Sequence, residues 1–159
     1  MRIAVLAVGR LKAGPERELF ESYAKLIRDL GRKAGISAFD VREVAEAQAA
    51  TPAERRRDEA RALSAAIPRG AVVIALDGGG KELASEGFAA DLARRRDAGQ
   101  HLAFLIGGPD GLGPDLLQQA SSALSLGQAT WPHRLARVML AEQIYRSVTI
   151  LLNHPYHRA

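Results

Sequence analysis

The sequence contains no cysteine, which excludes disulfides and thiolate metal ligands. It also lacks any apolar run near the roughly 18 residues that a membrane-spanning helix needs. The first eight residues are a strand-like apolar run that leads to Gly9 and Arg10 without the pattern of a signal-peptide cleavage site. These absences predict a cytoplasmic protein with no membrane partner.

Several signatures of catalysis or nucleotide binding are missing as well. The segment Asp77-Gly-Gly-Gly-Lys81 has the spacing of neither a P-loop nor a dinucleotide-binding fingerprint, and no Gly-x-Ser-x-Gly supports a serine nucleophile. His154 and His157 are spaced as a metal pair, but the nearest carboxylates, Glu142 and Asp115, leave the ligand set incomplete. We therefore predict no metal site, and a metal-dependent nucleotide-processing enzyme stays an alternative.

What is present is ordinary for a globular chain. The 159 residues are 47% hydrophobic and 25% charged, which predicts one domain spanning residues 1–159 with a sizeable core. The formal net charge is +4, carried mostly by arginine. This balance favours polyanions only weakly, and a solvated basic surface explains it equally well.

The hydrophobic pattern alternates between strands and helices along the whole chain. Apolar runs without a helical period predict strands, and apolar residues spaced by three and four predict helices. The alternation indicates an α/β fold with a parallel sheet and helices on both of its faces. The predicted strands are 2–8, 36–44, 71–76, 101–106 and 123–126, and the predicted helices are 15–30, 52–67, 85–96, 114–120 and 133–152.

Helix boundaries and faces follow from particular residues. Thr51-Pro-Ala-Glu54 predicts a capping box, and Ser85 is a candidate N-cap for the helix that follows it. In the last helix we expect one buried face, and Glu142 is placed to pair with Arg146 four residues later. The residues of that buried face are Leu135, Val138, Met139, Tyr145, Val148 and Leu152.

Four arginines, at positions 55, 56, 57 and 61, form the most basic stretch of the chain. They lie opposite the apolar face of the predicted helix 52–67. One interpretation is a solvated face partly paired with neighbouring carboxylates; the other is a surface that contacts phosphates.

Two glycine-rich loops follow successive predicted strands. Gly107 to Gly111 comes after strand 101–106, Gly127 to Pro132 comes after strand 123–126, and Leu76-Asp77 ends a third strand. Ligands of open α/β sheets bind outside the carboxyl ends of the strands. Backbone groups with apolar walls at this edge predict a pocket that suits an adenine ring better than a free phosphate.

Four motifs in the second half of the chain are distinctive when taken together. They are Leu-Ile-Gly-Gly-Pro-Asp-Gly (105–111), Leu-Ser-Leu-x-x-x-Thr-x-Pro-His (124–133), Arg137-x-x-Leu140-x-Glu142-Gln143-x-Tyr145-Arg146, and His154-Pro155-Tyr156-His157-Arg158. With these motifs the chain resembles, over its whole length, the RlmH family of the SPOUT superfamily, the 23S rRNA pseudouridine N3-methyltransferases. The start of the chain (residues 3–12) and residues 76–89 match that family too.

The resemblance implies a SPOUT fold, with a C-terminal trefoil knot, that works as a homodimer. The active site would be completed across the dimer interface, with S-adenosyl-L-methionine bound at the knot. Carried over by position, the cofactor-binding residues are Leu76, Gly107, Gly108, Leu126, Gly127, Gln128, Ala129, Thr130 and Trp131.

The same resemblance implies the substrate, which is the N3 atom of a pseudouridine in helix 69 of 23S rRNA within the assembled ribosome. The residues expected near that substrate are His133, Arg137, Arg146, Tyr156, His157 and Arg158. From the residues alone, the arginines of the last helix could equally be helix-surface charges, and a non-enzymatic ribosome-binding module remains the other alternative.

Overall fold

The computed structural model describes residues 1–158, which fold into five strands and five α-helices with one short 3-10 turn. In chain order the elements are β1 (Arg2–Val8), α1 (Pro15–Gly31), η1 (Arg32–Ala34), β2 (Ala38–Val44), α2 (Pro52–Ala66), β3 (Ala71–Glu82), α3 (Ser85–Asp97), β4 (His101–Ile106), α4 (Pro114–Gln119), β5 (Ser122–Ser125) and α5 (His133–Leu151).

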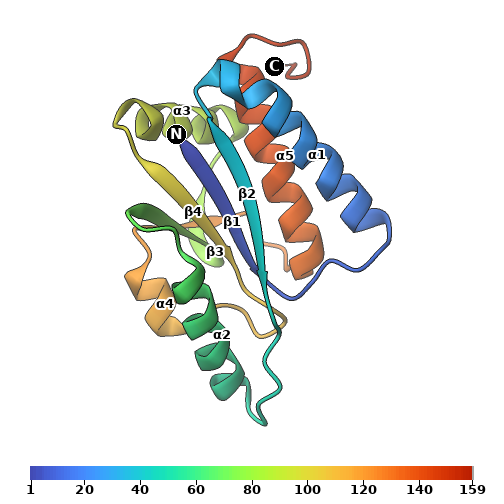
Figure 1. Cartoon of the computed structure of the whole chain (residues 1–159), viewed down its shortest axis with the longest axis vertical. Helices are drawn as coiled ribbons and strands as arrows, with labels where there is room; N and C mark the ends of the chain where they lie inside the picture. The colour runs from blue at the N-terminus through green and yellow to red at the C-terminus, as the bar shows by residue number, and fades with distance from the viewer. Residues whose placement is uncertain (159) are drawn as a thin grey trace.

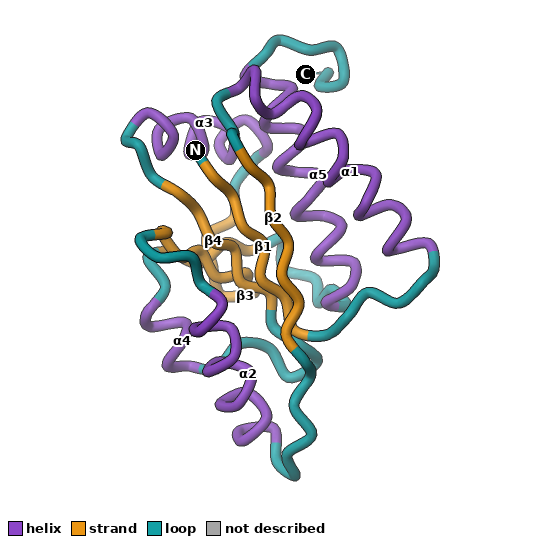
Figure 2. Tube along the Cα trace, in the orientation of Figure 1, coloured by secondary structure: helices purple, strands orange, loops and turns teal. Residues whose placement is uncertain are grey.

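The five strands form one parallel sheet in the order β2-β1-β4-β3-β5. Helices α1, α3 and α5 cover one face of this sheet, and α2 and α4 cover the other (Figure 1). The tube in Figure 2 shows the same three layers, with the sheet between the two sets of helices. The predicted α/β fold with a parallel, doubly covered sheet is confirmed.

Side chains that alternate along β1 divide the core into two halves, because successive residues of a strand point to opposite faces. Ile3 and Val5 pack toward α1, α3 and α5, whereas Ala4 and Leu6 pack toward α2 and α4. All are buried, which explains why the predicted strand is a continuous apolar run rather than an alternating one.

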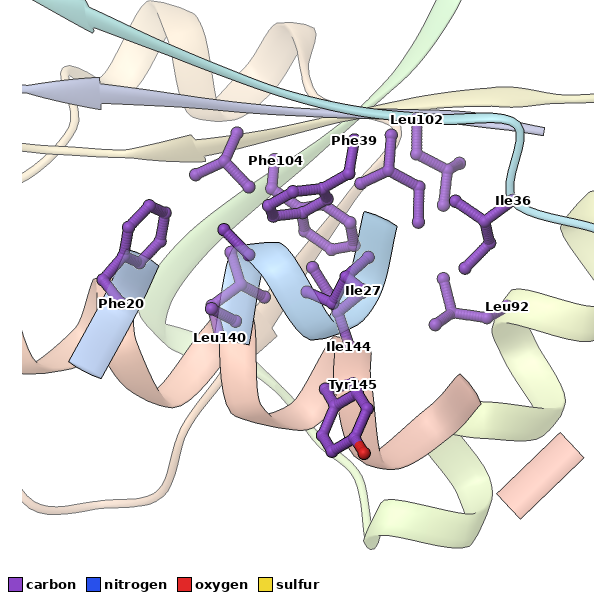
Figure 3. Packing of buried hydrophobic residues seen from close by; sticks show 14 of the residues in the cluster. Phe20, Ile27, Ile36, Phe39, Leu92, Leu102, Phe104, Leu140, Ile144 and Tyr145 are labelled. Carbon is purple, nitrogen blue, oxygen red and sulfur yellow. The ribbon is translucent and has the colours of Figure 1, made fainter. Parts of the chain in front are cut away.

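The larger half of the core contains the aromatic side chains. Phe104 of β4 meets Phe88 of α3 edge-on, with 6.1 Å between ring centroids. Ile27 of α1 and Ile144 of α5 are fully buried in the same cluster, and Figure 3 shows them with Phe104 beneath the strands. Burying branched and aromatic side chains from three helices fixes this layer firmly against the sheet.

Strand β3 is longer than predicted. It continues past Leu76 to Glu82, and its register on β5 shifts between Leu76 and Lys81, which both pair with Leu124. Glycine makes this possible: a Cβ on Gly80 would lie 2.6 Å from the carbonyl carbon of Ala123. The prediction of a loop after residue 76 was wrong because these glycines form a bulge against the sheet edge.

Of the two helix N-caps predicted from the sequence, one is confirmed and one is wrong. The capping box is confirmed, since Thr51 Oγ1 accepts from the Glu54 amide while the Glu54 carboxylate accepts from the Thr51 amide. The Ser85 N-cap was wrong: Ala84 holds that position, and Ser85 Oγ lies 2.9 Å from the side-chain oxygen of Gln143 in α5. Because α3 packs on α5, the Ser85 hydroxyl bonds Gln143 instead of an amide at the start of α3.

The buried face of α5 also differs from the prediction at its start. Leu135 is 40% exposed, whereas Leu140 and Ile144, which were not predicted, are fully buried. Two helices, α1 and α3, pack along α5, so its buried surface is wider than a single stripe.

No helix within residues 1–158 is both long and apolar enough to cross a bilayer. The knot implied by the resemblance stays a prediction, because strand order alone does not show how a chain threads.

A candidate cofactor pocket with a distant substrate tail

A cavity of about 670 Å³ opens at the carboxyl ends of β4 and β5, beside residues 76–78 in the middle of β3. Parallel strands end at the same edge, so the segments that follow them meet there. The first turn of α5 completes the wall with His133 and Ala136. The structure places all nine residues expected to bind the cofactor on this one cavity, namely Leu76, Gly107, Gly108, Leu126, Gly127, Gln128, Ala129, Thr130 and Trp131.

The loop after β4 is a tight turn that requires glycine. A Cβ on Gly107 would lie 2.6 Å from the backbone carbon of Gly111, and one on Gly108 would lie 2.9 Å from Val8 Cγ1. The Gly111 amide donates to the Gly108 carbonyl at 3.0 Å, and Gly111 has a φ of 77°. The turn therefore closes this tightly only because residues 107 and 108 carry no Cβ, and its residues 107–109 line the cavity.

An ion pair holds this loop from outside the cavity. Arg55 of α2 donates through Nε and Nη2 to the two carboxylate oxygens of Asp110, at 2.6 and 3.1 Å. The hydrogen bond from Arg55 lowers the pKa of the Asp110 carboxyl, which is therefore ionised at neutral pH. Arg55 was predicted only as part of a surface cluster, and no local signal links two residues 55 positions apart.

The loop after β5 folds back on itself to form the facing wall. Ser125 Oγ bonds the Gly127 amide at 3.2 Å, and the indole Nε1 of Trp131 donates to the Leu126 carbonyl at 3.3 Å. Gly127 has a φ of 112°, a conformation that other residues adopt only under strain. Trp131 is 43% exposed as a residue and lies on the cavity wall.

His133 is the predicted substrate residue that lies on this cavity. Burial lowers its pKa below the ordinary histidine value, and the charges of Arg134 and Arg137 lower it further. The imidazole is therefore neutral at pH 7 and can accept a proton from a group in the pocket.

Arg137 is buried, with only 1% of its surface exposed. Its guanidinium donates to Glu43 Oε1 at 2.6 Å and to the carbonyls of Val8 and Gly9 at 3.2 and 2.9 Å. The interpretation as a helix-surface charge was wrong, because the first turns of α5 pack against the ends of β1 and β2. Arg137 joins these three elements beneath the pocket.

The other predicted substrate residues form a separate cluster at the far end of α5. Glu142 Oε1 accepts from Arg146 Nε at 2.9 Å, which confirms the predicted pair, and from the Tyr156 hydroxyl at 3.0 Å. The Arg146 guanidinium stacks 5.1 Å from the Tyr156 ring centroid, and His157 Nε2 lies 3.2 Å from Glu86 Oε1. Arg158 follows, exposed, in the same tail.

One chain does not bring this cluster to its own cavity. Arg146 lies 13 residues beyond His133 on one helix, a rise of about 20 Å. Figure 1 shows the C-terminal tail at the amino edge of the sheet, opposite the loops that line the cavity. Among residues 1–158 no group of three histidine or carboxylate side chains is placed to hold a metal ion.

Comparison with known proteins identifies the family. Residues 1–157 match a family described as "Predicted SPOUT methyltransferase". The chain belongs to the SPOUT methyltransferase family. A methyltransferase needs a methyl donor. The membership confirms the resemblance read from the four motifs.

Full-length relatives support the same assignment. The chain is 52% identical over 160 residues to "Ribosomal RNA large subunit methyltransferase H" of Rhodopseudomonas palustris (strain ATCC BAA-98 / CGA009), covering 100% of both chains. It is 50% identical to the protein of that name from Nitrobacter hamburgensis, covering 99% of each. A probable methylase family protein from Haemophilus influenzae Rd KW20 shares the fold, with a TM-score of 0.52 and 11% identity over 99% of this chain and 70% of that one.

Proposed function

We propose that this protein is an S-adenosyl-L-methionine-dependent methyltransferase that methylates N3 of a pseudouridine in helix 69 of 23S rRNA, within the assembled ribosome. The observation that carries the proposal is the single cavity lined by all nine expected cofactor-binding residues. Relatives about 50% identical over their full length are named as large-subunit ribosomal RNA methyltransferases, which supports the substrate class. Ribosomes are cytoplasmic, so we place the enzyme there.

The pocket fits the proposed cofactor. Its volume lies within the range of small-molecule sites, and the wall formed by residues 107–112 keeps its tight turn because Gly107 and Gly108 carry no Cβ. When bound, S-adenosyl-L-methionine supplies a methyl group activated by the positive sulfonium. The loops after β4 and β5, together with residues 76–78 within β3, would bind and orient it, and orientation of reactants contributes up to ~7–11 kcal/mol in favourable cases.

The N3 proton must leave, because a neutral imide nitrogen is a poor nucleophile. His133, neutral and on the cavity wall, is one acceptor. His157 is another, and the arginines of the substrate cluster are a third solution, since they stabilise the N3 anion while water removes the proton. His157 lies too far from the cavity of its own chain to accept a proton there, so it would act at the cavity of a neighbouring subunit.

We propose a homodimer for this reason. The substrate cluster of one subunit would complete the cavity of the other, because the two lie at opposite ends of α5 in one chain. Exposed apolar side chains on the adjoining helices α1 and α5 support a partner there: Leu19 is 48% exposed, Leu26 36% and Leu135 40%. Leu19 and Leu26 are two helical turns apart, so they lie on one face of α1.

The test of the proposed function uses the wild-type protein. Calorimetric titration with S-adenosyl-L-methionine is expected to show binding, and mass analysis of rRNA from treated ribosomes is expected to show one added methyl group on the pseudouridine. We expect poor methylation of naked rRNA, since a chain with a net charge of only +4 binds free RNA weakly. Ribosome association without cofactor binding would indicate a binding module instead, and equal rates on naked rRNA and ribosomes would contradict the need for assembly.

The shared site is tested by mixing two impaired subunits at a concentration of S-adenosyl-L-methionine below its Kd for the wild type. One carries Gly107→Ala, which displaces the loop on the cavity wall and weakens cofactor binding; the other carries Tyr156→Ala, His157→Ala and Arg158→Ala, which disable the tail. After random exchange, half of the dimers are mixed and each has one intact site, so activity should return to about a quarter of the wild-type value. A mixture that exchanges subunits, shown by labelled chains, yet gains no activity over the two separate variants would contradict a site built from two subunits.

A further inference from the structure

A second hollow lies between α2 and α4, on the sheet face opposite α1 and α5. It has a volume of about 700 Å³, and three arginines of α2 lie along it. We call this hollow the arginine groove; its residues include Arg56, Arg57, Arg61, Gly113, Asp115 and Gln119. Helices α2 and α4 lie side by side in Figure 1, below the sheet and near the carboxyl ends of its strands.

Two of the arginines are exposed and have no close ion pair in the described part of the chain, so they can bind a ligand. Arg57 is exposed and makes no ion pair within residues 1–158. The Arg61 side chain is 73% exposed, and its nearest carboxylate, on Asp58, is 3.8 Å away. By contrast, Lys25 and Asp29 on α1 form a close i,i+4 pair at 2.5 Å. Arg57 and Arg61 are themselves i,i+4 neighbours of like charge, an arrangement that destabilises a helix unless an anion lies between them.

The arginine groove begins where the cofactor cavity ends. Residues Gly107 to Leu112 include most of one cavity wall, and the next residue, Gly113, lines the groove. Arg56 Nη1 lies 3.4 Å from the Asp110 carbonyl, within the same loop. A strand of nucleic acid with one base at the cavity therefore has its neighbouring backbone within reach of the groove.

We propose that the arginine groove binds the phosphate backbone of the rRNA strand that flanks the target nucleotide. This rests on the proposed function, because it assigns a surface to the same substrate. Guanidinium groups match phosphate oxygens in a two-pronged geometry, and successive arginines on one helix face suit successive phosphates. Asp115 is the one carboxylate in the lining, so the anion lies on the α2 side of the groove.

The experiment compares two variants with equal loss of charge. Arg57→Gln/Arg61→Gln removes the two exposed arginines of the groove, and Arg32→Gln/Lys33→Gln removes two exposed cations on η1, which follows α1 on the other face of the sheet. Methyl transfer to ribosomes is measured at several salt concentrations. The KM of the groove variant for ribosomes should be about tenfold higher than that of the wild type. In a plot of log KM against log salt concentration, its slope should be smaller by about 2. The η1 variant should match the wild type.

Three readouts separate the outcomes. Calorimetry with S-adenosyl-L-methionine should give the same Kd for both variants, because neither touches the cavity. If the wild type neither binds the cofactor nor methylates ribosomes, the proposed function fails; if it does both and the groove variant keeps its KM and salt slope, the groove inference alone fails. Photo-crosslinking from a benzophenone amino acid at position 61 should label rRNA, and labelling of a ribosomal protein instead would overturn the choice of RNA.

Discussion

Gly107→Ala is expected to weaken binding of S-adenosyl-L-methionine by at least about tenfold, which is about 1.4 kcal/mol. The added Cβ would lie 2.6 Å from the backbone carbon of Gly111 and 2.8 Å from the amide of Leu112. Backbone atoms inside a closed turn cannot move aside as a flexible side chain can. The loop that forms one cavity wall must therefore shift, at a stability cost of about 1–3 kcal/mol.

Gly78→Ala is the matched control for this prediction. Gly78 lines the same cavity, its φ is not positive, and a Cβ there meets nothing within 4 Å. Calorimetry should give this variant nearly wild-type affinity, and urea unfolding should leave its stability nearly unchanged. If both alanine variants bind the cofactor equally well, the loop at Gly107 is not the wall that shapes the site.

Glu43→Leu is expected to cost about 3 kcal/mol of unfolding free energy, because it leaves the buried Arg137 charge without its carboxylate. Arg137 donates to Glu43 Oε1 at 2.6 Å, and the Leu11 amide donates to the same oxygen at 3.1 Å. The carbonyls of Val8 and Gly9 still accept from the guanidinium, so the cost falls at the lower end of the range for a broken buried pair. Urea denaturation at fixed protein concentration measures it.

Asp40→Leu, on the same strand, controls for the loss of a carboxylate from β2. Asp40 pairs with Arg2 at 3.3 Å, and both side chains are largely exposed, so this change should cost less than about 1 kcal/mol. Adding Arg137→Met to Glu43→Leu should recover part of the lost stability, since no unpaired charge is then buried. Equal costs for Glu43→Leu and Asp40→Leu would show that the Arg137 pair does not hold α5 to the strand ends.

The candidate site could be read from the sequence where its residues belong to local patterns. Gly107 and Gly108 follow an apolar strand, and the run 126–131 follows the next one along the chain. Because parallel strands end at a common edge, these two facts are enough to predict that the loops meet. The cavity that contains both confirms the meeting, and binding of the cofactor there stays a prediction.

Other features escaped the sequence because their partners are distant along the chain. Arg55 and Asp110, which clamp the pocket loop, are separated by 55 positions, and Arg137 and Glu43 by 94. The spacing of charged residues in the sequence does not indicate which distant residue each one pairs with. An arginine predicted for the surface can therefore be buried by a partner far along the chain. The Ser85 hydroxyl shows the same effect, since its position suits an N-cap but its bond goes to another helix.

The sequence by itself determined the order of strands and helices, the parallel sheet and the two glycine-bearing loops after β4 and β5, because hydrophobic periodicity and turn residues act over a few positions. Only the tertiary structure decided which charges pair, that β3 extends through its glycines, and that the tail of a chain lies a helix length from that chain's own cavity. These outcomes depend on packing between elements far apart in the chain, where the free energy of burial and pairing outweighs local preference.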